Sequence, residues 1–411
     1  MKSIRIYCKN DGMYHDVPKG ATLEEVYETL DLNLPCCVTS CKVNNRVEGL
    51  HYTINDSRDL EYLTLASPSG LRTYTRSLFF VLYKAVRDLY PEAELRIGTP
   101  VSGGYFCRLS LPGGITPEVP ERLRRRMAEI VASDLPFRRV TAHTTDAIEV
   151  FRRQGFTRKV LLLESIGDLY THYYTLGETV DYFYSALLLR TGQLTVFDLV
   201  PFGEGLLLRV PDPEHPDRLR PMTEQHQMFA VFQEQHRRQE ILGCTTVGEL
   251  NTLIRAGHTN DLVNVAEALQ EKQIAQIADH IASHDALRVV LIAGPSSSGK
   301  TTFSKRLSVQ LMACGKKPVS ISLDNYFVDR ERTPLDETGD YDFEHIEALN
   351  LPLFNDQMNR LLVGEEVELP RYDFPTGKSV PSGRRLRLQP DTILILEGNH
   401  ALNPQLSTKI P

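Results

Sequence analysis

A glycine-rich octet at residues 294 to 301 carries the strongest chemical signal in the sequence. It reads Gly-Pro-Ser-Ser-Ser-Gly-Lys-Thr and fits the phosphate-loop pattern G-x-x-x-x-G-K-[ST]. Gly294 and Gly299 let the backbone wrap closely around phosphate oxygens, with N–H groups pointing inward. The pattern therefore predicts that ATP binds here. The residues assigned to the loop are Gly294, Pro295, Ser296, Ser297, Ser298, Gly299, Lys300, Thr301 and Thr302.

The last two residues of the octet predict a charge and a metal ligand. Lys300 would place an ammonium group at the β- and γ-phosphates, and the Thr301 hydroxyl can bind Mg²⁺. The predicted cofactors are therefore ATP and Mg²⁺. The alternative is a chance glycine-serine turn, against which the flanking sequence argues.

The flanks of the octet have the pattern of a strand and a helix. The run at 288 to 293 is short, apolar and β-branched, as in a buried parallel strand. Apolar residues at helical spacing follow over 301 to 313, and Gly315 can end that helix. The helix would direct the positive end of its dipole at the bound phosphates.

Two further apolar runs end in carboxylates. The run at 319 to 323 precedes Asp324, and the run at 392 to 396 precedes Glu397. Ligands bind at the carboxyl ends of parallel strands, so both acids are expected beside the loop. Asp324 can accept a proton from an attacking hydroxyl, and Glu397 can position the Mg²⁺ shell. The alternative for either acid is a helix cap or a surface charge.

The order of the motifs in this segment resembles that of the uridine kinase and phosphoribulokinase family. After the loop come Leu-Asp-Asn-Tyr-Phe at 323 to 327, Tyr-Asp-Phe at 341 to 343, Leu-Pro-Arg-Tyr-Asp-Phe at 369 to 374 and Ile-Leu-Glu-Gly at 395 to 398. The resemblance implies that Asp324 is the base that activates a nucleoside 5′-hydroxyl. It also implies an acceptor site formed by Tyr326, Asp342, Tyr372 and Phe374.

The sequence departs from that family in two ways. Gly377 stands where the pyrimidine kinases carry a histidine, so the resemblance leaves the acceptor base open. The family also continues past Gly398 with two strands and an arginine-bearing lid. We therefore expect the 411 residues to be a fragment with little activity of its own.

Residues 1 to 66 have the pattern of a small α+β domain of the β-grasp kind. Asn-Asp-Gly at 10 to 12 is a hairpin turn signal, and Thr22 with Glu25 forms a capping box. Short strands are expected over 41 to 47 and 59 to 65. The segment resembles the TGS domain of threonyl-tRNA synthetases.

After a predicted linker at 67 to 70, residues 71 to 220 resemble the editing domain of the same synthetases. The resemblance rests on a helix expected over 78 to 91 and on motifs at 97 to 106 and 146 to 151. Arg76 and Phe80 stand at the two histidines of the family's His-x-x-x-His motif. The family's Cys and His positions fall within 182 to 187, which contain neither type. We expect the editing fold without editing chemistry.

The expected fold class is multidomain α+β and α/β. Residues 221 to 285 have helical periodicity and form a predicted connector, and 286 to 411 form the phosphate-loop domain, a parallel α/β domain that is incomplete at its C-terminus. His280 and His284 could share a helix face as metal ligands, and Cys36, Cys37 and Cys41 could bind zinc. Surface histidines and reduced thiols are the preferred interpretations.

The charge pattern does not by itself predict RNA binding. A net charge of −7 gives no general attraction to nucleic acid, so any basic surface must be local. Ten basic residues in the editing-like segment could bind RNA phosphates, or could lie on a solvated face beside glutamates, which we favour. They are Arg122, Arg124, Arg125, Arg126, Arg138, Arg139, Arg152, Arg153, Arg158 and Lys159.

The leading hypothesis is an ATP- and Mg²⁺-dependent kinase that phosphorylates a ribonucleoside. One alternative is an RNA-binding or regulatory protein in which the nucleotide site is a switch. Another is a kinase for a sugar phosphate, although the aromatic Tyr372 and Phe374 favour a base. No apolar run approaches 18 residues, so we expect no membrane span and a cytoplasmic protein. The sequence predicts no oligomeric state.

Overall fold

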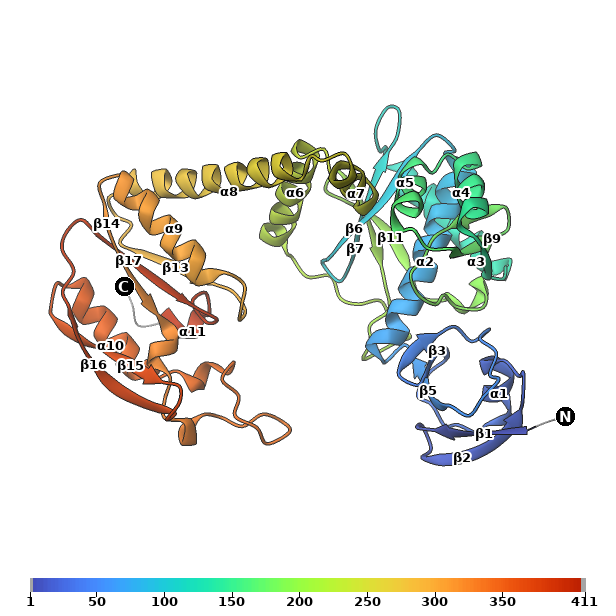
Figure 1. The fold of residues 1–411 in the computed structure, drawn as a ribbon, viewed down its shortest axis with the longest axis horizontal. Helices are drawn as coiled ribbons and strands as arrows, with labels where there is room; N and C mark the ends of the chain where they lie inside the picture. The colour runs from blue at the N-terminus through green and yellow to red at the C-terminus, as the bar shows by residue number, and fades with distance from the viewer. Residues whose placement is uncertain (1–2, 408–411) are drawn as a thin grey trace. The chain divides into compact units, whose positions relative to one another are not determined.

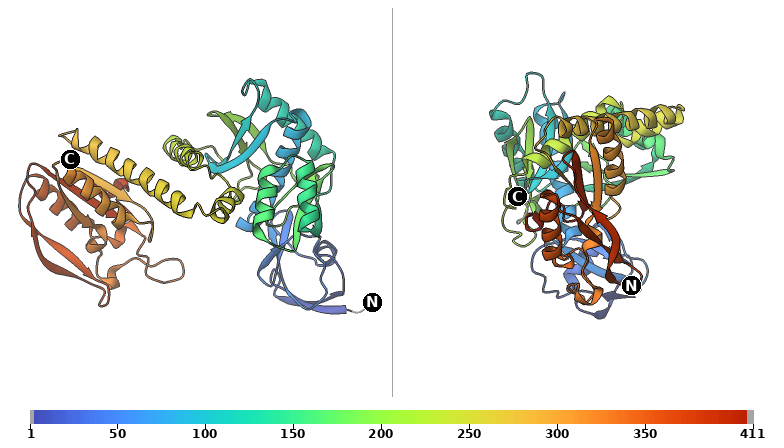
Figure 2. Two further views of the ribbon diagram at one scale, coloured as in Figure 1. Left: turned by 45° about the horizontal axis from the view of Figure 1, so that its top comes forward. Right: turned by 90° about the vertical axis from the view of Figure 1, so that its left-hand side faces the viewer.

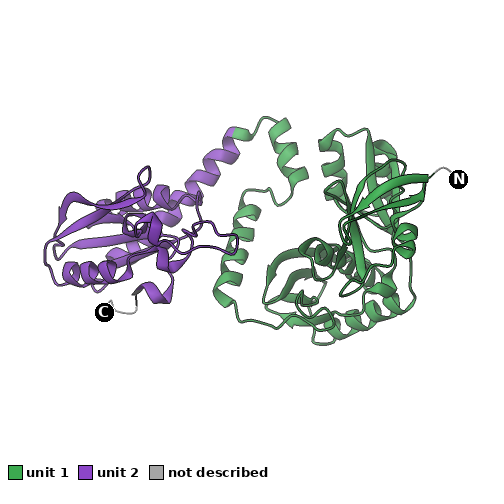
Figure 3. Ribbon diagram, turned by 90° about the horizontal axis from the view of Figure 1, so that it is seen from below, with its two compact units in different colours: residues 1–259 green, residues 260–411 purple. Residues whose placement is uncertain are grey.

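The computed structural model describes residues 3–407, which divide into two compact units between residues 259 and 260 (Figure 3). Over those residues, no helix is both long and apolar enough to cross a membrane. The first unit is α+β and the second contains a parallel sheet. Each unit has its own hydrophobic core.

The first unit begins with a five-stranded mixed sheet in the order β2-β1-β5-β3-β4 (Figure 1). Its strands are β1 (Ser3–Cys8), β2 (Met13–Pro18), β3 (Val38–Val43), β4 (Arg46–Glu48) and β5 (Asp59–Thr64). The predicted hairpin is confirmed, because β1 and β2 pair antiparallel in register Cys8 with Met13. Helix α1 (Leu23–Thr29) places Leu23 and Val26 in the core of this sheet.

The capping box at the start of α1 is also confirmed. The Thr22 hydroxyl accepts a hydrogen bond from the Glu25 backbone N–H at 3.2 Å, and the Glu25 carboxylate accepts from the Thr22 N–H at 2.8 Å. Two N–H groups that a helix start would leave unpaired are satisfied in this way.

Helix α2 (Pro68–Leu89) begins about ten residues earlier than the sequence suggested. The predicted linker at 67 to 70 is therefore wrong. Ser67 is the N-cap, since its hydroxyl accepts from the Gly70 N–H at 3.1 Å, and Pro68 takes a first-turn position where a missing N–H costs nothing. Gly70 is buried against the end of β5, where an added Cβ would lie 2.0 Å from the Thr64 carbonyl oxygen.

We expect a Gly70→Ala substitution to destabilise the first unit by about 2 kcal/mol or more, because the new methyl group would overlap backbone that belongs to a packed sheet. Thermal and urea unfolding measure the change. The neighbouring Ser69→Ala substitution removes only an exposed hydroxyl contact to Arg72 and serves as the control. Equal melting temperatures for the two variants would contradict this close packing.

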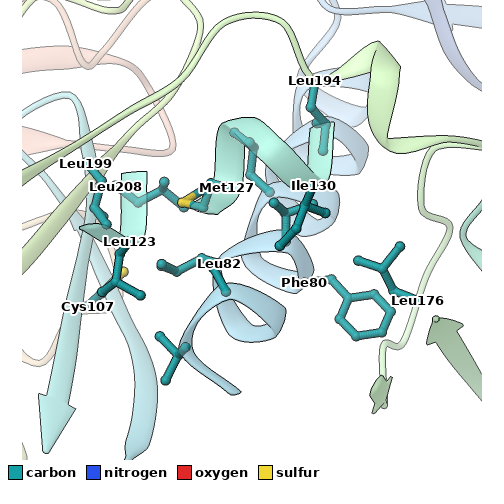
Figure 4. Packing of buried hydrophobic residues seen from close by; sticks show 14 of the residues in the cluster. Phe80, Leu82, Cys107, Leu123, Met127, Ile130, Leu176, Leu194, Leu199 and Leu208 are labelled. Atoms are coloured by element: carbon teal, nitrogen blue, oxygen red, sulfur yellow. The ribbon is translucent and has the colours of Figure 1, made fainter. Parts of the chain in front are cut away.

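The remainder of the first unit packs two further sheets around α2. The four-stranded sheet has the order β11-β12-β7-β6, and the three-stranded sheet has the order β10-β9-β8. Figure 4 shows Phe80 and Leu82 of α2 among buried residues of α3 and the strands. The elements are β6 (Glu94–Val101), β7 (Gly104–Ser110), α3 (Glu118–Ala132), β8 (Arg138–His143), α4 (Thr144–Arg153), α5 (Thr157–Ile166), β9 (Tyr170–Leu176), β10 (Thr179–Asp181), β11 (Asp198–Phe202) and β12 (Gly205–Arg209).

The helical character predicted for 221 to 285 is confirmed. It comprises α6 (His226–Ile241), α7 (Val247–Arg255) and α8 (Thr259–Ala282). Helix α8 is one uninterrupted helix in every view (Figure 2). It buries Ile274, Ala278 and Ile281 against the second unit's sheet and α9.

The second unit is built on a three-stranded, wholly parallel sheet in the order β13-β17-β14. Strand β17 lies in the middle, and all seven of its residues are buried. A two-stranded antiparallel hairpin, β15 with β16, and helix α10 complete the unit. The bounds are β13 (Val289–Ala293), α9 (Lys300–Ala313), β14 (Lys317–Ser322), α10 (Leu351–Leu362), β15 (Val367–Asp373), β16 (Lys378–Leu386), β17 (Thr392–Gly398) and α11 (Pro404–Ser407).

Candidate active site

The glycine-rich loop joins the end of β13 to the first turn of α9. Gly299 has a left-handed φ of 86°, which a glycine adopts without strain, and it immediately precedes Lys300, the first helical residue. Gly294 has no room for a side chain, because an added Cβ would lie 2.7 Å from Ser298 Oγ. The strand, loop and helix expected from the sequence are therefore present, and the loop is open to solvent from Pro295 to Gly299.

The two functional side chains at the start of α9 are held by distant residues. Lys300 Nζ donates to the Pro295 carbonyl oxygen at 2.9 Å and to Asn399 Oδ1 at 3.2 Å. Thr301 Oγ1 donates to Glu397 Oε1 at 3.0 Å. The structure thus brings together the loop and the end of β17, which are about one hundred residues apart in the sequence.

Asp324 lies in the same group of residues. It follows β14 in a short 3₁₀ helix, Leu323–Tyr326, and Gly398 approaches this helix so closely that an added Cβ would lie 2.7 Å from Leu323 Cβ. The residue is exposed overall. Even so, partial burial of its carboxyl and the negative charge of Glu397 raise the pKa of Asp324, while Lys300 acts in the opposite direction.

An aromatic cluster lies next to Asp324. The Phe327 ring centroid is 5.5 Å from that of Phe343, 5.4 Å from that of Tyr372 and 6.4 Å from that of Phe374. Tyr372 and Phe374 are themselves 5.0 Å apart. Two of the predicted acceptor-site residues, Tyr372 and Phe374, therefore lie together, and Phe374 is 56% exposed.

Of the other two predicted acceptor-site residues, Tyr326 lies in the core and Asp342 lies in the loop segment directly before Phe343. Tyr326 is only 1% exposed, and its hydroxyl donates to Gln357 Oε1 at 2.8 Å inside the core. Asp342 Oδ1 accepts from the Glu344 backbone N–H at 2.9 Å and thereby shapes a loop. Phe327 and Phe343, which the sequence reasoning did not select, take the positions beside Asp324.

Two features of the cluster bear on what it could bind. The Tyr372 hydroxyl is buried and has no hydrogen-bond partner among the described residues. Gly377 has a φ of 68°, and an added Cβ would lie 2.8 Å from Arg330 Nε. Arg330 fills the space beside this glycine and donates to the Phe374 carbonyl oxygen at 2.6 Å.

A small cavity lies beside Asp324 and Phe327. It is lined by Leu323, Asp324, Phe327, Phe343, Leu349, Asn399 and His400. Asn399 also holds Lys300, while His400 Nε2 hydrogen-bonds to the Glu344 carbonyl oxygen at 2.7 Å. Sequence reasoning missed both residues, although their position directly after Glu397-Gly398 was an available signal.

The site also fits a magnesium ion. A hydroxyl, Thr301 Oγ1, and a 7% exposed carboxylate, Glu397, lie in contact beside the phosphate loop. Mg²⁺ prefers such oxygen ligands and commonly takes only one or two from the protein, the remainder coming from water and substrate phosphates. Thr301 and Glu397 would therefore hold the ion, which when bound would neutralise charge on the β- and γ-phosphates.

A glycine loop, a parallel sheet and carboxylates at its carboxyl edge together define a phosphate-loop kinase domain. The comparison with family models agrees. Residues 289–405 match the model described as the phosphoribulokinase / uridine kinase family, so the C-terminal segment is a domain of that family.

The N-terminal region is similar to another class of protein. It matches the threonine–tRNA ligase of Symbiobacterium thermophilum with 29% identity over 201 residues, which are 49% of this chain and 31% of that protein. The ligase of Desulforamulus reducens is 31% identical over 165 residues, which are 40% of this chain and 26% of that protein. The chain thus spans less than a third of the length of either ligase.

One solved structure described as a possible uridine kinase, from Bacillus stearothermophilus, is 23% identical, covers 31% of this chain and 70% of its own, and has a TM-score of 0.27.

The residues that replace the editing site's histidines and cysteine contribute to packing and hydrogen bonding in this protein. Arg76 donates through Nε and Nη2 to the Ala186 carbonyl oxygen, at 3.2 and 3.0 Å. Phe80 is fully buried in the core. Tyr182, Phe183 and Tyr184 provide rings rather than a thiol or an imidazole in the segment that faces Arg76.

Proposed function

We propose that the second unit transfers the γ-phosphoryl group of ATP to the 5′-hydroxyl of a ribonucleoside. The observation that carries this proposal is the cavity whose lining Asp324 shares with both Phe327 and Asn399. Asn399 holds the loop lysine, and Phe327 belongs to the aromatic cluster. A carboxylate between a phosphate loop and a set of rings is well placed to act on a hydroxyl attached to a base-bearing sugar.

Each residue has a simple chemical role in this proposal. The Asp324 carboxylate accepts the proton of the attacking hydroxyl as the new P–O bond forms. Lys300 and the loop N–H groups stabilise the negative charge that remains on the departing ADP. Phe374 and the neighbouring rings orient the acceptor base, and Thr301 with Glu397 would hold Mg²⁺.

The Tyr372 hydroxyl gives a test of the acceptor site. A Tyr372→Phe substitution should leave the melting temperature unchanged or slightly raised, because it removes a buried hydroxyl that has no hydrogen-bond partner among residues 3–407. It should raise KM for the acceptor about tenfold if that hydroxyl pairs with the substrate. Measuring both quantities separates the roles, and an unchanged KM would place the acceptor away from Tyr372.

The raised pKa of Asp324 predicts a pH dependence. The base must be ionised, so kcat/KM should fall as pH decreases through the pKa of Asp324, at a pH above the ordinary carboxyl value of 3.8. Glu397→Gln removes the negative neighbour and should move the midpoint of that fall to lower pH, whatever it does to the absolute rate. Full pH–rate profiles of the parent and the variant check the direction, and a shift to higher pH would contradict it.

The proposal is tested by ADP release from the intact protein over a panel of acceptors: the common ribonucleosides, their 2′-deoxy forms and several sugar phosphates. A ribonucleoside should give the highest kcat/KM. Sugar phosphates are a second candidate class of acceptor, because Arg330 is a cation next to the aromatic cluster and cations bind phosphate groups. Turnover of sugar phosphates alone would replace the nucleoside assignment while preserving the kinase.

For the whole chain we propose a TGS-like β-grasp domain over 1 to 66, a catalytically degenerate editing-like domain over 71 to 220, a helical connector over 221 to 285 that crosses from the first unit into the second, and the kinase domain at 286 to 411. The matches to threonine–tRNA ligases support the first two assignments.

The same matches also favour RNA contact as a second function of the protein. Against it, several arginines are already paired: Arg124 with Glu121, Arg126 with Asp88 and Arg158 with Glu94, each at 2.8 Å. A salt-sensitive gel shift of tRNA would support RNA contact, and no shift at low salt would exclude it.

A further inference from the structure

A cavity of about 170 Å³ lies wholly within the first unit, away from the phosphate loop in sequence. Its walls come from β4, β8, β9 and the segment 182 to 186. Arg46, Arg139, Tyr170, His172 and Tyr184 are among the lining residues. Arg76 and Phe80, where the synthetase resemblance would place histidines, do not line it, but residues 182 to 186, from the segment where the resemblance would place a Cys and a His, do.

Arg139 is the main cationic group available in this cavity. Its Nη1 lies 3.9 Å from Glu48 Oε2, which is too long for a hydrogen bond, and its side chain is 29% exposed. Glu48 is paired more closely with Arg46, whose Nε lies 3.2 Å from Oε1. Within residues 3–407 the Arg139 guanidinium has no recorded hydrogen bond, so its planar set of donors can serve a ligand.

The charge of Arg139 acts on the groups around the cavity. The pKa of His172 is lowered first by burial and second by the charge of Arg139. Arg46 lowers this pKa further, and Glu48 raises it. The same two causes, burial and Arg139, lower the pKa of His51, whose Nε2 is buried and has no hydrogen-bond partner in the described residues. After burial, the positive charge of Arg139 is thus the next cause at both histidines, and it favours an anion on the arginine side of the cavity, whose lining also includes Glu48 and Asp168.

Exposed rings form part of the cavity wall. Tyr170 is 52% exposed and Tyr184 is 76% exposed. The Tyr184 ring is supported edge-on by Tyr182 at 5.0 Å, and the Tyr170 ring lies 4.6 Å from that of His143. Rings that are supported on one side and open on the other are suitable platforms for stacking a planar group.

We propose that this cavity is a binding site for a free mononucleotide, with the phosphate on Arg139 and the base on Tyr170 or Tyr184. Both parts of the ligand have a counterpart in the walls: Arg139, which makes no side-chain hydrogen bond within the described part of the chain, suits the phosphate, and the exposed tyrosine rings suit the base. A cavity of about 150 Å³ holds a single benzene ring. The cavity can therefore hold either the base or the phosphate of the nucleotide, and the rest of the nucleotide would lie at its opening.

A mononucleotide fits better than an RNA chain. Binding a chain requires several cations along a track of phosphates. Here the described lining offers Arg139 and Arg46 and no longer track of cations, and Arg124, Arg126 and Arg158 of the same unit are engaged with carboxylates. The site is independent of the kinase proposal, because none of its residues lies in the second unit.

The test is hydrogen–deuterium exchange of the whole chain with UMP or AMP, which locates binding even if nucleotide also occupies the kinase domain. We expect protection over residues 139 to 144 and 170 to 186. Arg139→Gln should raise the nucleotide concentration needed for half-maximal protection by at least about tenfold, as expected for losing a charge-assisted contact. The control, Arg125→Gln, changes a 71% exposed arginine outside the cavity and should have no effect.

Tyr184→Ala provides a second variant, because its exposed side chain can be removed without disturbing the core. It should weaken UMP and AMP binding but leave the melting temperature unchanged. Uridine, adenosine, inorganic phosphate and tRNA complete the comparison. The proposal is overturned if the nucleosides or inorganic phosphate protect the segments as strongly as the nucleotides, if only tRNA protects them, or if Arg139→Gln has no effect.

Discussion

An Asp324→Asn variant is expected to lose phosphoryl transfer by about 10²- to 10⁴-fold in kcat, the usual contribution of a general base. The amide cannot accept the hydroxyl proton, yet it keeps the size and shape of the carboxylate. Asp324 is exposed overall, so the substitution should not unfold the second unit. Loss of one negative charge beside Glu397 should leave Mg-ATP binding intact.

The measurements are single-turnover phosphoryl transfer and direct ATP binding by calorimetry. Asp356→Asn is the matched control, since this acid lies exposed on α10 and makes only a 3.6 Å ion pair with Arg360. It should retain the parent rate. If Asp324→Asn turns over as fast as the parent, another group takes the proton and the assignment of Asp324 is wrong.

A Lys300→Ala variant should lose both ATP affinity and rate, with kcat reduced about 10²-fold or more. The ammonium group would meet the β- and γ-phosphates, where charge develops as the bond to the γ-phosphorus breaks. In the free protein its bonds to the Pro295 carbonyl and to Asn399 keep it at the loop, so little reorganisation is needed when ATP binds.

Lys305→Ala is the control for charge, because Lys305 is exposed and lies on the same helix, five residues further along. Both variants lower the net charge equally. A general electrostatic effect would therefore slow both, whereas the specific role of Lys300 requires the control to remain fully active. Equal losses in the two variants would contradict the phosphate-loop assignment.

The contiguous parts of the site could be predicted from sequence, because their geometry is local. The glycine loop and its flanking strand and helix occupy one stretch of chain, and the motif defines them. The encounter of Thr301 with Glu397 could also be anticipated, since the carboxyl ends of parallel strands share one edge. The strand order β13-β17-β14 could not be anticipated, because it depends on packing over the whole unit.

The aromatic residues show the limit of the motif argument. Tyr326 and Phe327 are adjacent, and the resemblance selected the first. The 3₁₀ helix at Leu323–Tyr326 turns the Tyr326 ring toward Phe354 and Gln357, and Phe327, just after it, faces the cavity. The direction of the backbone at this turn decides which of the two adjacent side chains is buried, and no pattern in the sequence predicts that direction.

The sequence at the start of α2 resembles a linker, because serine, proline and glycine are common both in linkers and at the beginnings of helices. Ser67 and Pro68 are also a helix N-cap followed by a first-turn proline, and burial of Gly70 against β5 decides for the helix. The cavity in the first unit could not be predicted at all, because residues 46 to 49 and 139 to 186 meet only through the tertiary fold.

The central place of β17 has a consequence for synthesis on the ribosome. Strands β13 and β14 emerge first, but each pairs only with β17, and the sheet order leaves no ladder between them. Until residues 392 to 399 have been translated, the loop lysine lacks Asn399 and Thr301 lacks Glu397. The nascent chain therefore cannot complete its triphosphate site when the glycine loop emerges, and the site is assembled only when β17 inserts between β13 and β14.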